Sequence, residues 1–155
     1  MPNTASEKSN QEFWAALVPE LVVSDITRSL NFYCSICGFQ IRYGSPAERF
    51  VYIELGKAHL MLEEYSEHVW LTDKLEPPFG RGLNLKIIID DVEHLYNRFQ
   101  SQGVLFYRPI KEDWYRHGEI EHGQRQFLVQ DPDGYLLRFA QHLGARMSSL
   151  EHNPE

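Results

Sequence analysis

The chain has 155 residues, of which 43% are hydrophobic, and a formal net charge of −7 at pH 7. This length suits one domain with a core that needs no disulfide or metal to hold it together. The negative charge repels phosphate groups and attracts cations, which argues against non-specific nucleic-acid binding. No apolar run approaches the ~18 residues of a membrane span, and the polar N-terminus lacks the apolar core of a signal peptide. We therefore expect a cytoplasmic protein without membrane or nucleic-acid partners.

Both ends of the chain are polar, and a stretch rich in proline and glycine divides its middle. Polar termini are often frayed, and such a stretch is typical of a linker. The predicted boundaries are a flexible extension over 1–16, a single domain over 17–143 and a flexible tail over 144–155. Within the domain, module one covers about 17–64, the linker 65–82 and module two about 83–143.

Module one is predicted to begin with a strand over 18–23. A helix follows, because Ser24 or Asp25 can accept hydrogen bonds from the free N–H groups at its start, and Gly38 can end it. Three further strands are expected over 39–43, 50–55 and 58–64, the last two joined by a tight turn at Gly56 and Lys57.

Cys34 and Cys37 form a C-x-x-C motif in this helix. They lie in its last turn, where the negative end of the helix dipole disfavours thiolates. We therefore interpret them as reduced, structural thiols rather than a redox pair.

Module two repeats the order of module one. A strand over 83–89 leads to a helix that begins at Asp90 or Asp91 and ends at Gly103. The remaining strands are expected over 104–108, 126–130 and 135–140, the last two joined by the turn Asp131-Pro132-Asp133-Gly134. The segment 109–124 has no counterpart in module one, and we interpret it as an insertion of the kind that often carries binding specificity.

A strand, a helix and three strands thus occur twice, at a spacing of roughly 65 residues that indicates a duplicated module rather than a solenoid. The mixture of helices and strands places the chain in the α+β class. Two similar sheets would leave a cleft between or within them for a ligand.

The segments VPELVVSDITRSLNFY, ERFVYIELGKAHLMLEE, PFGRGLNLKIIIDDVEHLY and RQFLVQDPDGYLLRFA carry a resemblance to the vicinal-oxygen-chelate superfamily. That superfamily contains glyoxalases, extradiol dioxygenases, fosfomycin-modifying enzymes and bleomycin-resistance proteins, and the chain resembles the last branch most. The resemblance covers about residues 18–143. It implies a glyoxalase/bleomycin-resistance-like fold, in which tandem β-α-β-β-β modules form curved mixed sheets around a groove. It also implies a homodimer with ligand grooves at or near the subunit contact.

Enzymes of this superfamily hold a divalent metal with one side chain from the first and one from the last strand of each module. The resemblance places these positions at Val18, Asn84, Arg138 and one of His59, Leu60 or Met61. Valine cannot coordinate a metal, arginine repels a cation, and one histidine with one amide is too small a donor set. We therefore expect no metal, no other cofactor and no catalytic residue at this place.

A second metal site is conceivable in the insertion, where His117 and His122 flank Glu119 and Glu121. A solvated turn with alternating polar residues is the more common meaning of such a short motif.

Strand alternation places Glu20 on the face that carries the metal positions of the family. The aromatic residues of the insertion have no evident packing role, so they suit stacking on a planar or cationic ligand. The predicted groove residues are Glu20, Glu63, Asn84, Lys86, Trp114, Tyr115, Arg116 and Arg138. The alternatives for Glu20 and Lys86 are a wet face without a ligand, or a weak mutual ion pair. The alternative for Trp114 is that it anchors its loop or lies in a dimer interface.

The resemblance then implies a non-catalytic protein that binds and sequesters a small cationic or aromatic molecule, with bleomycin-family antibiotics as the leading ligand. An acidic, aromatic groove complements such a drug. Two alternatives stay open. One is a lyase, isomerase or dioxygenase of the same superfamily with a non-standard site, such as an acid–base pair that uses Glu20 or Glu63. The other is a module that binds a partner protein.

Overall fold

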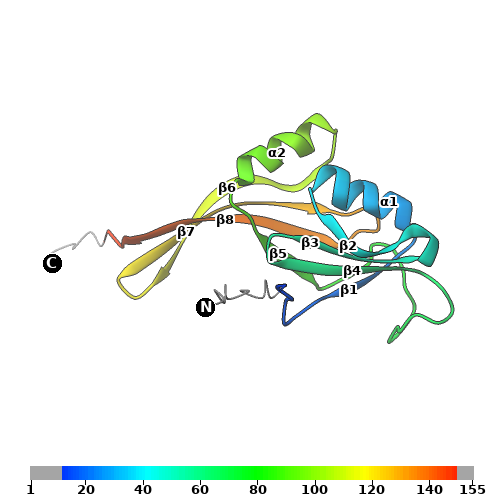
Figure 1. The fold of residues 1–155 in the computed structure, drawn as a ribbon. Helices are drawn as coiled ribbons and strands as arrows, with labels where there is room; N and C mark the ends of the chain where they lie inside the picture. Colours follow the sequence, from blue (N-terminus) through cyan, green and yellow to red (C-terminus); the bar gives the residue numbers. More distant parts are fainter. Residues whose placement is uncertain (1–11, 150–155) are drawn as a thin grey trace, which may run out of the picture.

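The computed structural model describes residues 12–149, which form two modules with the same order of elements (Figure 1). Module one contains β1 (Glu20–Val23), α1 (Ile26–Leu30), a π-helical turn η1 (Asn31–Ile36), β2 (Gln40–Ser45), a 3-10 turn η2 (Pro46–Glu48), β3 (Phe50–Leu55) and β4 (Ala58–Glu64). Module two contains β5 (Asn84–Ile88), α2 (Val92–Ser101), β6 (Phe106–His117), β7 (Ile120–Gln130) and β8 (Leu136–Met147). In this part of the chain, no helix has the length and apolar character needed to cross a membrane.

Each module forms one mixed four-stranded sheet. The strand order is β1-β4-β3-β2 in the first, here called sheet A, and β5-β8-β7-β6 in the second, sheet B. In both sheets the first strand runs parallel to the last strand of the module, and the other neighbours are antiparallel. The predicted α+β class and the duplicated topology are therefore confirmed.

The helices begin at the predicted acidic residues. The Asp25 carboxylate accepts a hydrogen bond from the Arg28 N–H, and the Asp91 carboxylate accepts one from the His94 N–H. Thirteen positions separate Asp25 from Gly38, whereas twelve separate Asp91 from Gly103. The π-helical turn η1 accommodates the additional residue, as such turns do when one residue is inserted into an α-helix.

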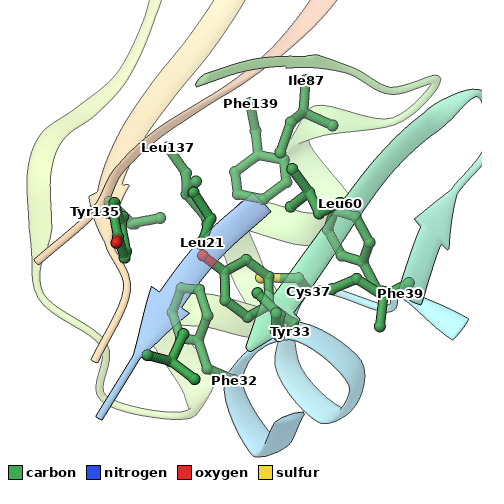
Figure 2. Packing of buried hydrophobic residues seen from close by; sticks show 14 of the residues in the cluster. Leu21, Phe32, Tyr33, Cys37, Phe39, Leu60, Ile87, Tyr135, Leu137 and Phe139 are labelled. Carbon is green, nitrogen blue, oxygen red and sulfur yellow. The ribbon is translucent and has the colours of Figure 1, made fainter. Parts of the chain in front are cut away.

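One hydrophobic core joins the modules. Leu21, Tyr33 and Leu60 of module one lie in the same cluster as Leu137 and Phe139 of module two, and Figure 2 shows them converging. Figure 1 shows both helices on the same side of the pair of sheets. The helices cover one face of each sheet, and within residues 12–149 no helix covers the opposite faces, here called the open faces.

The turn between β7 and β8 fastens module two to module one. The Asp131 carboxylate accepts hydrogen bonds from the Tyr33 hydroxyl at 2.8 Å and from the Tyr135 N–H at 2.9 Å. The Tyr135 hydroxyl donates to the Val22 carbonyl at 2.9 Å, and Asp133 accepts from the Ser24 N–H at 3.0 Å. The Tyr135 N–H bond lies within the turn, whereas the other three join the turn to β1, residue 24 and η1 over 98 to 113 positions, so they fix the relative orientation of the sheets.

Three features differ from the sequence expectations. The segment 109–124 is not a loop, because it extends β6 and β7 into a long hairpin. Strand β8 continues to Met147, beyond the predicted domain boundary at 143. Residues 12–16 contact sheet A rather than projecting from the domain.

The two cysteines are free thiols. Burial raises the pKa of Cys34, and burial together with the nearby Asp131 carboxylate raises the pKa of Cys37 well above its ordinary value. Since a redox pair needs a depressed thiol pKa, the predicted structural role is the one that fits.

Candidate functional site

The candidate site is the open face of the two sheets. Leu21, Val51 and Leu62 point into the core from sheet A, and the residues between them point to the opposite side. The open face of sheet A carries Glu20, Val22, Tyr43, Phe50, Tyr52, Glu54, His59, Met61 and Glu63. The open face of sheet B carries Asn84, Lys86, Ile88, Gln126, Leu128, Leu136, Arg138 and Ala140.

Two carboxylates and an indole form a small pocket on sheet A. The pocket has a volume of about 180 Å³ and is lined by Glu20, Val22, Glu63 and Trp70. Burial raises the pKa of Glu20, and the adjacent Glu63 carboxylate raises it further. Two like charges held this close favour either a shared proton or a bound cation. Trp70 comes from the linker and is 93% exposed, so no packing contact occupies its ring.

An aromatic platform lies beside this pocket. The rings of Tyr43 and Tyr52 are stacked with centroids 5.0 Å apart, and the Phe50 ring lies 5.9 Å from Tyr43. Phe50 pairs with Glu63 across β3 and β4, which makes the platform continuous with the carboxylate pair. The predicted site omitted these rings, although strand alternation could have found them, because Phe50 and Tyr52 are two positions apart in one strand.

The face of sheet B has the opposite charge. Lys86 pairs with Arg138 across β5 and β8, and both lie on the open side. Burial lowers the pKa of Lys86, and the Arg138 guanidinium lowers it further. The Arg138 Nε is buried without a hydrogen-bond partner in the described part of the chain. The open face of sheet B is therefore positively charged, and the Arg138 Nε–H is free to donate a hydrogen bond to a ligand.

The three predicted residues of the insertion separate in the structure. Tyr115 lies on the open side, where its hydroxyl accepts a hydrogen bond from Gln126 at 3.0 Å. Trp114 lies on the other side of the hairpin, with the Arg146 guanidinium 3.8 Å from its ring centroid. A Cβ at Gly123 would lie 2.6 Å from that ring, so a larger residue there would displace it. Arg116 is exposed and donates to the Gly118 carbonyl at the hairpin end. The structure does not bring Trp114 or Arg116 together with Glu20 and Glu63.

The pairing register decides between the three candidates for the fourth metal position of the family. Glu20 pairs with Met61 in sheet A, and Lys86 pairs with Arg138 at the equivalent place in sheet B. Met61 is therefore the counterpart of Arg138, whereas His59 lies two positions earlier in β4.

The four positions thus hold Val18, Met61, Asn84 and Arg138. One amide, one thioether and a fixed positive charge do not fit a hard divalent cation. From residue 12 to residue 149, no group of three histidine, cysteine or acidic side chains is placed to hold a metal. In the alternative set, Glu121 is paired with Arg146 at 2.8 Å.

Comparisons with known proteins agree with this architecture. Residues 15–139 match the Glyoxalase/Bleomycin resistance protein/Dioxygenase superfamily. The chain is 25% identical over 135 residues to a bleomycin resistance protein of Geobacillus stearothermophilus, covering 81% of this chain and 96% of the relative. It is 27% identical over 124 residues to a probable lactoylglutathione lyase of Synechocystis sp., covering 77% and 88%.

A solved structure of a protein of unknown function from Agrobacterium tumefaciens superimposes with a TM-score of 0.63 at 26% identity, covering 85% of this chain and 97% of that one. The family match spans both modules and the open faces that carry the candidate site. This chain therefore belongs to the Glyoxalase/Bleomycin resistance protein/Dioxygenase superfamily.

Proposed function

We propose that the protein binds and sequesters a small, planar, cationic molecule without chemical change, and that a bleomycin-family antibiotic is the leading candidate. The observation that carries this proposal is the pocket in which Glu20 and Glu63 lie beside the exposed Trp70. A cation there would relieve the repulsion between the two carboxylates and contact the face of an indole. Such a cation–π contact contributes about 0.5–2 kcal/mol, depending on how far it is desolvated.

The adjacent aromatic platform supports a planar ligand. Tyr43 and Phe50 lie on the same open face as the carboxylates, within reach of a ligand that extends from the pocket. A bleomycin-type molecule joins cationic groups to a planar aromatic unit. This combination complements carboxylates next to aromatic rings, and a relative named for bleomycin resistance supports the same ligand class.

A second copy of the chain completes the site in this proposal. The open face of sheet A is acidic at Glu20 and Glu63, whereas that of sheet B is basic at Lys86 and Arg138. In a symmetric homodimer, sheet A of one protomer faces sheet B of its partner, so that unlike charges oppose each other. Each groove then contains residues of both copies, and the Arg138 guanidinium gains an acceptor.

The test is a fluorescence titration of the purified protein with metal-free and copper-loaded bleomycin, at low and moderate salt. We expect saturation near one drug per chain. Glu20→Gln and Glu63→Gln should each weaken binding by about tenfold, because each removes a charge that faces the ligand. Trp70→Phe should weaken it by less, since a smaller ring stays in place.

Glu119→Gln is the matched control, because it removes one exposed negative charge at the β6–β7 turn and should leave the Kd unchanged. No saturable binding by the unmodified protein, or equal losses in Glu119→Gln and Glu20→Gln, would overturn the proposal.

A metal-free acid–base enzyme is the second candidate. The raised pKa of Glu20 favours it, because burial and the adjacent Glu63 let this carboxyl hold its proton to a higher pH than an ordinary glutamate, as a general acid requires. The similarity to a probable lactoylglutathione lyase points the same way. Turnover of a hemithioacetal substrate that is lost in Glu20→Gln, together with a failed bleomycin titration, would favour this candidate over sequestration.

A further inference from the structure

The segment Glu12–Ala16, here called the strap, lies across the open face of sheet A. Its Phe13 ring makes an edge contact with His59 at 5.4 Å, and its Trp14 ring makes one with Tyr52 at 5.3 Å. The Arg42 guanidinium lies 4.2 Å from the Trp14 ring centroid. The strap thus contacts β2, β3 and β4, and it covers one edge of the aromatic platform.

Two hydrogen bonds hold the backbone of the strap. Arg42 donates to the Phe13 carbonyl at 2.6 Å, and the Ala15 N–H donates to the His59 Nδ1 at 3.3 Å. The side chains of the strap contribute less to its attachment than these two hydrogen bonds, since Phe13 and Trp14 are each about half exposed. The backbone of the strap therefore depends on a single histidine for the position of Ala15.

The contacts of His59 assign its proton. A backbone N–H can only donate, so the Nδ1 has to present its lone pair to Ala15. The Tyr52 hydroxyl also lies 2.6 Å from this atom and donates to the same lone pair, which it shares with the longer bond from Ala15. The ring proton is then on the Nε2, which is buried without a hydrogen-bond partner and lies 3.5 Å from the Glu54 carboxylate. Neutral His59 is thus the form that accepts the strap.

We propose that the strap is a pH-sensitive cover of the ligand face, held in place by neutral His59 and released when His59 takes up a second proton. A protonated imidazole has no lone pair at the Nδ1 and cannot accept from Ala15. Its charge would also enter a site from which water is excluded, because the His59 side chain is fully buried.

The charged and titratable groups around His59 come from two neighbouring strands and the strap. Tyr52 and Glu54 face it from β3, Arg42 from β2, and Glu12 of the strap lies 3.5 Å from Arg42. Burial lowers the pKa of His59 and Arg42 lowers it further, whereas Glu54 opposes both. Glu54 is already paired with Arg42 at 2.8 Å, which limits its capacity to stabilise an imidazolium.

The sign of the pH effect follows from this arrangement. The covered state lowers the pKa of His59, so it binds fewer protons than the released state. The cover is therefore most stable above the ordinary histidine pKa of about 6.5 and weakens as the pH falls below that value. Release would uncover Tyr52 and Tyr43, and with them the part of the platform nearest β2.

Residue-resolved hydrogen exchange by NMR tests this without any ligand, so its outcome is independent of the proposed drug binding. The measurement compares the Ala15 amide in the full chain at about pH 7.5 and about pH 5, each corrected for intrinsic exchange. We expect its protection to fall by about tenfold or more at the lower pH, while amides of the buried strand β3 keep theirs. Equal protection of Ala15 at both values would overturn the proposal.

Two variants distinguish release of the strap by protonation of His59 from a general loss of structure at low pH. His59→Gln keeps a neutral acceptor for Ala15, so we expect the pH dependence of the strap to disappear. The double variant Phe13→Ala/Trp14→Ala weakens the cover from the other side, and linkage requires it to raise the pKa of His59 toward about 6.5.

Leu17→Ala is the matched control, because Leu17 follows the strap and is 82% exposed. An unchanged pKa of His59 in the double variant would contradict the proposal even if His59→Gln failed to fold.

Discussion

The two modules have the same topology but opposite charge on their open faces. Glu20 and Lys86 occupy equivalent places on β1 and β5, and Met61 and Arg138 occupy equivalent places on β4 and β8. The core residues beneath them are apolar in both modules. A duplicated scaffold therefore fixes where the site residues lie, while the open positions can diverge without cost to the core.

The modules also differ in how they connect to each other. The turn that follows β7 fastens onto the β1–α1 junction through Asp131, Asp133 and Tyr135. The equivalent turn in module one, at Gly56 and Lys57, is short and exposed. These hydrogen bonds between the modules therefore come from the β7–β8 turn of module two, here called the joint. Because they tie this turn to module one, the two halves should unfold together.

The largest expected effect is on this shared core. Phe139→Ala removes a fully buried ring and should cost about 3–5 kcal/mol of unfolding free energy. Urea unfolding followed by far-ultraviolet circular dichroism and by tryptophan fluorescence should give one coincident transition, because both modules share the core. Leu105→Ala, at an 88% exposed position, should change stability by no more than about 0.5 kcal/mol. Two separate transitions would show that the halves are independent.

The hydrogen bonds of the joint should contribute less to the free energy of unfolding than the shared core does. Tyr33→Phe removes only the hydroxyl that donates to the buried Asp131, which leaves the carboxylate one partner short. We expect a loss of about 1–3 kcal/mol in the same urea experiment. Tyr107→Phe deletes a hydroxyl at a 63% exposed position and serves as the control. Equal stabilities of the two variants would show that the Tyr33–Asp131 hydrogen bond does not stabilise the contact between the modules.

Charge-reversal variants of the two open faces test the proposed dimer. In the proposed dimer, Glu20→Lys and Lys86→Glu each place like charges across the groove, and each should weaken self-association by about tenfold or more. The double variant restores unlike charges in reversed order and should recover much of that loss. Sedimentation equilibrium measures all three. A double variant whose losses simply add would argue against facing sheets.

The smallest expected effect is on the pH dependence of folding stability. The pKa of Glu20 is raised and that of Lys86 is lowered in the folded chain, so folding disfavours the charge at both positions. The Glu20 contribution to stability therefore improves as the pH falls through its raised pKa. The Lys86 contribution improves as the pH rises toward its ordinary pKa of about 10.4. Direct NMR titration of both side chains should find shifts in opposite directions, and shifts of the same sign would contradict the comparison.

Much of the fold follows from local sequence signals. Asp25 and Asp91 cap helices because a carboxylate next to free N–H groups needs no distant partner. The strands at 50–55 and 58–64 match β3 and β4, since a tight Gly56-Lys57 turn fixes their pairing. The prediction of the open positions Glu20, Lys86 and Arg138 combined strand alternation with the metal positions that the family resemblance implies.

Tertiary structure decided the rest, because those features depend on contacts between distant parts of the chain. Whether Trp114 faces the groove depends on the register of β6 against β7, and its own neighbours in sequence do not encode that register. Met61 rather than His59 stands opposite Glu20 because of the β1–β4 pairing. The strap was predicted to be flexible from its polar surroundings, yet Arg42 and His59, some 30 and 44 positions away, hold it on sheet A.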